Sequence, residues 1–136
     1  MKKFVICLLA FLICGCRRTI DFDFDTYKQS LHISNGYFYD LCFENDSVLP
    51  NGKSYEGALF LIWQDSLCVP PTKIDLNNYI PNGYIVSRGG ISSSERKIKL
   101  KANSTYTISS TGLGAVECRI KAWTNRNGKI LKAVKY

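Results

Sequence analysis

The fold of this chain is decided by its C-terminal part, residues 97–136, which read KIKLKANSTYTISSTGLGAVECRIKAWTNRNGKILKAVKY. Four short runs with alternating apolar residues, at 97–101, 105–109, 116–123 and 129–136, are separated by turn residues. Alternation with a period of two is typical of strands that have one buried face. The pattern therefore predicts consecutive antiparallel strands joined by turns.

The strand pattern continues toward the N-terminus. Apolar residues alternate with aspartates at 20–25, and the runs at 55–63 and 83–88 are apolar enough to be strands. The pair Asn35-Gly36, between the apolar runs 31–33 and 37–43, predicts a hairpin turn. Together these runs predict an all-β fold, a small antiparallel immunoglobulin-like β-sandwich of seven or eight strands, with a small closed barrel as the alternative.

Residues 1–15 have the composition of a secretory leader. Lys2 and Lys3 form a positive start, and an apolar run extends from Phe4 to Ile13. As a helix this run would rise only about 15 Å, roughly half the hydrocarbon thickness of a bilayer. We therefore expect it to direct export and to be removed.

The leader ends in Ile13-Cys14-Gly15-Cys16, which resembles the lipobox of bacterial lipoproteins. The resemblance implies cleavage after Gly15 and lipidation of Cys16. Arg17 follows, where an aspartate would favour the inner membrane, so the resemblance implies a lipid anchor on the periplasmic face of the outer membrane. The alternative is an ordinary leader that leaves Cys16 as a free thiol.

On this reading residues 16–18 are the lipidated cysteine and a short tether, and residues 19–136 form a single β-sandwich domain. The net charge falls from +7 to +5 because Lys2 and Lys3 leave with the leader. Residues 17–85 hold five basic and nine acidic side chains, whereas residues 86–136 hold eleven and two. This asymmetry suggests a basic surface, and export argues against nucleic acid as its partner.

Three cysteines remain in the expected domain: Cys42, Cys68 and Cys118. An oxidising compartment favours one disulfide, and three pairings are open. We favour Cys42–Cys68, with Cys118 as a buried thiol in an alternating strand. A zinc site is disfavoured by the cysteine spacing and the single histidine, and we expect no metal or cofactor.

The sequence carries no motif of an enzyme. His32, the only histidine, lies in a predicted strand without a nucleophile elbow to support it. The run Asp21-x-Asp23-x-Asp25 fits a strand better than a calcium loop, because Thr26 stands where that loop needs glycine. We therefore expect a protein without catalytic residues or a small-molecule substrate.

Basic side chains at alternate positions predict a partner-binding face. On each of two expected strands, every second residue should point the same way. If the two strands share one sheet, they present basic groups and an aromatic ring to an acidic protein partner. The alternative is that lysines merely line solvent-facing positions. The predicted partner-binding residues are Lys97, Lys99, Lys101, Arg119, Lys121 and Trp123.

Two short motifs carry a family resemblance. The strand Asp40–Phe43 contains a Leu-Cys pair, and Leu100–Tyr106 reads LKANSTY. With the leader and lipobox, this layout resembles the small periplasmic immunity lipoproteins of type VI secretion systems in enteric bacteria. Asn103 stands where that family often has glycine. The resemblance implies a protein that binds a toxic effector delivered into the periplasm and blocks it by occlusion.

Two other classes of function fit the same sequence. A lipoprotein inhibitor of a cell-wall hydrolase would share the anchor and architecture, although the basic C-terminal part is unfavourable for binding cationic enzymes. An envelope assembly or adaptor lipoprotein would be favoured by a hydrophobic rather than a charged surface patch.

Overall fold

The computed structural model describes residues 20–47, 50–52, 57–110 and 118–136. The predicted leader, Cys16 and the tether at 16–18 lie outside these residues. Within the described part of the chain, no helix is long and apolar enough to cross a membrane.

Two antiparallel sheets contain the ten strands of the described residues. The small sheet has the order β1-β2-β5, formed by Phe22–Asp25, Ser30–Ile33 and Lys73–Asp75. The large sheet has the order β10-β9-β8-β3-β4-β6-β7. In chain order its strands are β3 (Asp40–Asn45), β4 (Leu59–Trp63), β6 (Tyr84–Arg88), β7 (Ile91–Ser92), β8 (Thr105–Ser110), β9 (Cys118–Thr124) and β10 (Ile130–Lys135).

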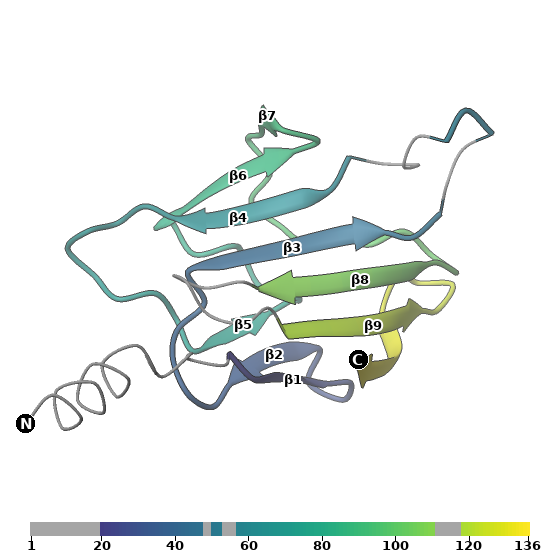
Figure 1. The fold of residues 1–136 in the computed structure, drawn as a ribbon, viewed down its shortest axis with the longest axis horizontal. Coiled ribbons are helices and arrows are strands. Elements are labelled where there is room, and N and C mark those ends of the chain that lie inside the picture. The colour runs from purple at the N-terminus through teal and green to yellow at the C-terminus, as the bar shows by residue number, and fades with distance from the viewer. Residues whose placement is uncertain (1–19, 48–49, 53–56, 111–117) are drawn as a thin grey trace, which may run out of the picture.

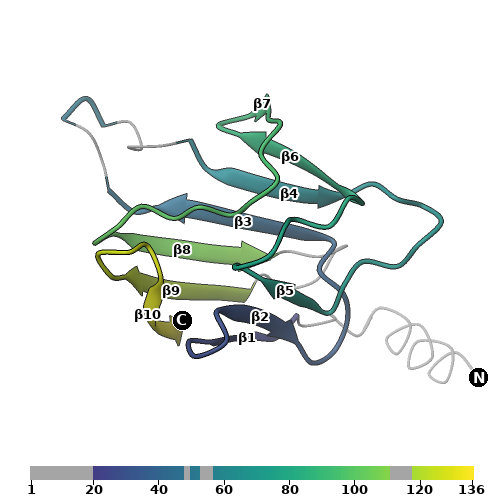
Figure 2. The same ribbon diagram turned by 180° about the vertical axis from the view of Figure 1, so that it is seen from behind.

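The predicted antiparallel β-sandwich is confirmed (Figures 1 and 2). The large sheet is open, with β10 and β7 at its edges. Ten strands form rather than seven or eight. β5 and β7 were not predicted, because their three and two residues are too short to show a period.

The core lies between the small sheet and one face of the large sheet, which we call the inner face. Strand alternation supplies it, because every second residue of each strand turns inward. The inward side chains include Leu41, Phe43, Leu59, Leu61, Ile108 and Ile120 from the large sheet and Phe22, Leu31, Ile33 and Ile74 from the small one. The predicted alternation at 20–25 is confirmed, with exposed aspartates between inward phenylalanines.

Polar contacts join the two sheets along one side. Gln29, in the turn between β1 and β2, donates its Nε2 to the Ile130 carbonyl at 2.8 Å and accepts the Ile130 N–H at 2.9 Å. Lys135 of β10 lies 2.5 Å from a carboxylate oxygen of Asp21 and 2.8 Å from one of Asp23. Its hydrogen bonds to these two aspartates raise the pKa of Lys135.

The connections β5–β6 and β7–β8 run across the inner face beside the small sheet (Figure 2). Ile80 and Ile98 anchor them in the core. Arg96 donates from its guanidinium to the carbonyls of Ile80 and Pro81 at 2.9 Å and of Tyr84 at 3.3 Å. The inner face is therefore packed under β4 and β6 as well.

The predicted hairpin at Asn35-Gly36 is wrong. β2 pairs with β1 and β5, whereas β3 pairs with β4 and β8 of the other sheet. The Asn35 side chain instead accepts the Asp21 N–H at 3.2 Å, and Gly36 has φ 148°. The type I′ hairpin turn that Asn-Gly favours needs positive φ at both central residues, and Asn35 does not have it. The pair marks a crossover between sheets.

The predicted strand at 97–101 is also wrong. Its one ladder contact is an isolated bridge between Lys97 and Tyr79. Ile98 and Leu100 pack toward the core while Lys97 and Lys99 are exposed. The alternation is real, but it belongs to a single extended segment that crosses the inner face.

Candidate partner-binding surface

The face of the large sheet opposite the core, the outer face, carries exposed apolar side chains. Phe60 and Ile62 of β4 are 37% and 44% exposed, and Ile85 of β6 is 52% exposed. Ile62 and Ile85 are cross-strand partners, and Phe60 lies two residues along β4 from Ile62. These three residues form a continuous apolar patch. Such a patch indicates an interaction site, whereas single scattered apolar residues on a surface do not.

Basic and aromatic side chains occupy the other half of the outer face. Arg119, Lys121 and Trp123 alternate along β9 with buried Ile120 and Ala122. The ammonium of Lys132 lies 5.1 Å from the centroid of the Trp123 ring, a cation–π contact. We call Arg119, Lys121, Trp123 and Lys132 the basic stripe.

The strand register places the apolar patch and the basic stripe on one surface. Phe60 pairs with Cys42, Cys42 with Ser109, and Ser109 with Arg119. Three strand spacings separate Phe60 from Arg119, about 14 Å. Both features therefore fit within one standard protein interface of about 800 Å² per partner. The outer face faces the viewer in Figure 1.

The six predicted partner-binding residues do not form one surface. Arg119, Lys121 and Trp123 share the outer face, as predicted. The segment of Lys97, Lys99 and Lys101 crosses the inner side instead, where the Lys101 N–H donates to the Tyr106 hydroxyl at 2.8 Å. Lys97 lies 4.7 Å from the centroid of the exposed Tyr79 ring. The prediction that these three lysines share a surface with β9 is wrong, because their segment joins neither sheet.

The apolar patch was not predicted from the sequence. The apolar run at 55–63 predicts a strand but does not indicate which of its faces stays uncovered. β4 lies in the interior of the sheet, but only one of its faces, with Leu59, Leu61 and Trp63, packs on the core. The available signal was that a strand apolar at successive positions needs cover on two sides, and the chain has few elements to supply it.

The predicted Cys42–Cys68 disulfide is not formed in the structure, nor is any other among the three described cysteines. Cys42 points to the outer face opposite Phe60. Cys68 is exposed in the loop after β4, and its carbonyl accepts from Nε1 of Trp63 at 3.0 Å. Cys68 is thus held at Trp63, which lies three residues, about 10 Å, along β4 from Phe60, the residue opposite Cys42. Cys118 pairs with inward-facing Ser110, so it lies on the opposite face from Cys42.

The LKANSTY motif behind the family resemblance forms a turn whose hydrogen bonds lie within the domain. The Tyr106 hydroxyl accepts the Lys101 N–H five residues upstream, similar to the tyrosine corner of immunoglobulin-like domains. Thr124 donates its hydroxyl to the Lys101 carbonyl at 2.6 Å and accepts the Ser104 N–H at 2.9 Å. Asn103 has φ 50°, a conformation that favours glycine and tolerates asparagine.

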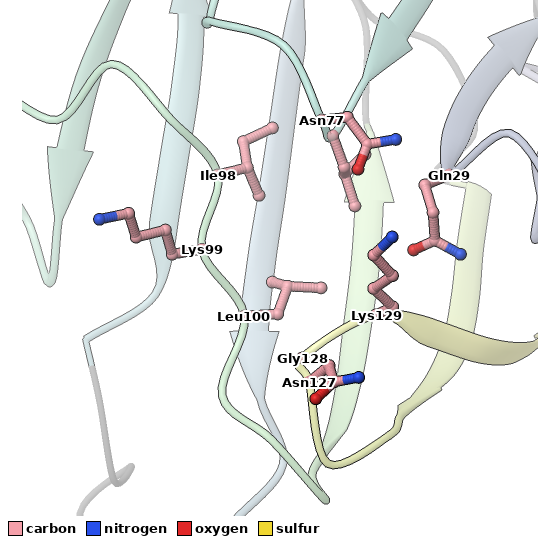
Figure 3. A pocket seen from close by; sticks show the side chains of 9 residues that line it. Gln29, Asn77, Ile98, Lys99, Leu100, Asn127, Gly128 and Lys129 are labelled. Atoms are coloured by element: carbon pink, nitrogen blue, oxygen red, sulfur yellow. The ribbon is translucent and has the colours of Figure 1, made fainter.

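A shallow cleft of about 350 Å³ lies between the two sheets near the β9–β10 turn (Figure 3). Lys129 points along it, whereas Lys99 points away. The Gln29 amide is engaged with the carbonyls of Thr26 and Ile130, and Asn77 donates to the Lys28 carbonyl. Gln29 thus joins the two sheets, and Asn77 ties the end of β5 to the turn between β1 and β2.

The titratable side chains of the described residues act mainly in the fold. No group of three histidine, cysteine or carboxylate side chains among them could hold a metal ion. His32 lies exposed on β2 between Asp23 and Lys73 of the neighbouring strands. Burial and, secondarily, the Asp40 charge raise the pKa of Tyr84, whose hydroxyl donates to the Phe38 carbonyl at 2.5 Å.

Comparison with known proteins gives no relative. No family model matches the chain, and neither the curated proteins nor the solved structures give a significant match.

Proposed function

We propose that this protein is a membrane-anchored periplasmic lipoprotein that binds and neutralises a secreted toxic effector, using the outer face of its large sheet. The observation that carries the proposal is the combination of the apolar patch with the basic stripe within about 14 Å. Arginine and tryptophan beside desolvated apolar side chains are the residues that dominate protein–protein binding energy.

The anchor is inferred from the sequence. A positive start, an apolar run too short to span a bilayer and the lipobox-like Ile13–Cys16 together support export and lipidation at Cys16. Arg17 supports the outer membrane as the final location. A protein held there meets an effector as it enters the periplasm.

The family resemblance supports the same function. The backbone conformation of Asn103 is one in which glycine is favoured, so the difference from the immunity lipoproteins at this position is conservative. The LKANSTY motif acts through the turn it builds rather than by contacting a partner.

The mechanism is occlusion, which needs no chemistry. A hydrogen-bonded sheet presents side chains in fixed rows, so little conformational entropy is lost on binding. The basic stripe steers an acidic partner surface into contact and speeds association, while the apolar patch slows dissociation. The bound protein then covers the toxin's working surface.

Survival of a sensitive host tests this function. The product of the neighbouring gene is exported to the periplasm with this protein, with its Cys16→Ser variant, or alone. We expect killing by the neighbour alone, full rescue by the native protein and weaker rescue by Cys16→Ser, which loses the anchor. A harmless neighbour, or killing that the native protein leaves unrelieved, would contradict the pairing.

A second candidate function is that of an envelope assembly adaptor. The observation that favours it is the hydrophobic character of Phe60, Ile62 and Ile85. An adaptor binds a permanent partner, so the native protein would co-purify with an envelope component in cells that lack the toxin. Its deletion would then impair envelope integrity without any toxin present.

A further inference from the structure

The loop between β4 and β5 presents two apolar side chains to solvent in a fixed shape. Leu67 is 93% exposed and Val69 is 67% exposed. Nε1 of Trp63 donates to the carbonyls of Asp65 and Cys68, at 2.8 and 3.0 Å. The Asp65 carboxylate accepts the Leu67 N–H at 2.9 Å. The fold thus holds this loop by its backbone and leaves the apolar side chains outside.

Hydrogen bonds place this loop at the end of the domain where the described chain begins. The carbonyls of Pro71 and Thr72, at the end of the loop, accept the N–H groups of Phe38 and Ile33 at 3.0 and 2.9 Å. Ser34, which lies between Ile33 and Phe38, contacts the start of β1 because its N–H donates to the Asp21 carbonyl. The loop and β1 start lie at the same end in both views (Figures 1 and 2).

That end is also the one nearest the membrane if Cys16 is lipidated. Only three residues lie between Cys16 and Ile20, and the four steps from one Cα to the next span at most about 14 Å when fully extended. With Cys16 in the bilayer, the start of β1 would lie within this distance of the membrane, and the loop occupies the same end of the domain. Exposed leucine and valine side chains at this distance bury apolar surface by entering the interface rather than remaining in water.

We propose that Leu67 and Val69 insert into the headgroup region of the bilayer and form a second membrane contact beside the lipid anchor. This inference rests on the proposed anchor at Cys16. The two contacts fix the orientation of the domain. The strands of the large sheet lie lengthwise from that end to the opposite one, so the outer face stands upright and open to the periplasm (Figure 1).

The test uses the lipidated full-length product reconstituted into phosphatidylethanolamine–phosphatidylglycerol vesicles. Exposed Cys68 is labelled with one equivalent of an environment-sensitive dye, and peptide mass analysis verifies the site. The reference probe is Asn127→Cys in a Cys68→Ser background, at the exposed β9–β10 turn. Vesicle flotation measures the anchor, and quenching by nitroxide-labelled lipids measures insertion.

We expect the dye at Cys68 to shift to the blue on reconstitution and to be quenched about twofold by shallow nitroxides, while the dye at Asn127→Cys is not. The double variant Leu67→Asp, Val69→Asp should lower quenching at Cys68 to the level of the reference probe. The matched control Ile91→Asp, Leu131→Asp, which removes similarly exposed apolar side chains elsewhere, should leave it unchanged.

The outcomes separate the two proposals. Protein that floats with vesicles but shows no quenching at Cys68 overturns the loop contact and leaves the anchor standing. Protein that does not float overturns the anchor and the loop contact together. Quenching that persists in the aspartate double variant also overturns the assignment to Leu67 and Val69.

Discussion

At the scale of single residues, the join between the two sheets depends on Gln29. Gln29 is only 7% exposed, and its backbone has φ 52°. The nitrogen and the oxygen of its side-chain amide both form hydrogen bonds with the backbone of Ile130, on the edge strand of the other sheet. Because 101 positions separate the two partners in the sequence, these hydrogen bonds join distant parts of the chain.

Replacing Gln29 by alanine should lower the free energy of unfolding by about 2–6 kcal/mol. The substitution leaves a buried N–H and a buried carbonyl of Ile130 without partners, at about 1–3 kcal/mol each. Urea denaturation followed by fluorescence measures the effect. Gln64→Ala, at an exposed glutamine, is the matched control and should change little. Equal stability of Gln29→Ala and the native protein would contradict this role.

At the scale of elements, alternation predicted most strands because each has one face on the core. The runs that became β1, β4, β6, β8 and β9 follow this rule, whereas a register shift between Ile130 and Lys132 interrupts it in β10. Sheet membership could not be predicted this way. Asn35-Gly36 sits at a crossover, and the extended segment at 97–101 has the alternation of a strand without a neighbour to pair with. The basic stripe on β9 was predictable, but the apolar patch depended on which face of β4 stays uncovered.

The extended β7–β8 connection should contribute to stability as core packing. Ile98→Ala removes a side chain that is 7% exposed and should cost about 2–4 kcal/mol through lost burial and the cavity left behind. Lys99→Ala, at the next and exposed position, is the matched control and should cost far less. The denaturation midpoint measures both, and similar losses for the two variants would contradict packing by Ile98.

The edge of the sheet at β6 and β7 should have a pH-dependent stability. Arg88 contacts the Glu95 carboxylate at 3.0 Å, and its hydrogen bond holds the pKa of Glu95 below the ordinary value. The carboxylate therefore stabilises the fold at neutral pH, and the contribution is lost as the pH falls through this lowered pKa.

The Glu95→Gln variant should accordingly be modestly less stable than the native protein near pH 7, and the gap should close in strong acid. Urea midpoints at the two pH values measure the gap. Glu44→Gln, which removes an exposed carboxylate from β3, serves as the control. A gap for Glu95→Gln that stays constant with pH would exclude the ion pair as its cause.

At the scale of the whole molecule, one sheet performs two tasks with its two faces. The inner face packs against the small sheet and the two connections, and the outer face exposes the apolar patch and the basic stripe. The lysines at 97 and 99 lie outside this surface. The molecule therefore contains its own matched control for any claim about the outer face.

The most direct test is the affinity of the purified protein for the product of the neighbouring gene, measured by calorimetry at fixed salt. We expect Ile62→Asp with Ile85→Asp, and separately Arg119→Glu with Lys121→Glu, each to weaken binding at least about tenfold. Lys97→Glu with Lys99→Glu should change it less than about twofold. Full affinity in both outer-face variants, with loss in the Lys97 and Lys99 variant, would contradict the outer face as the binding surface.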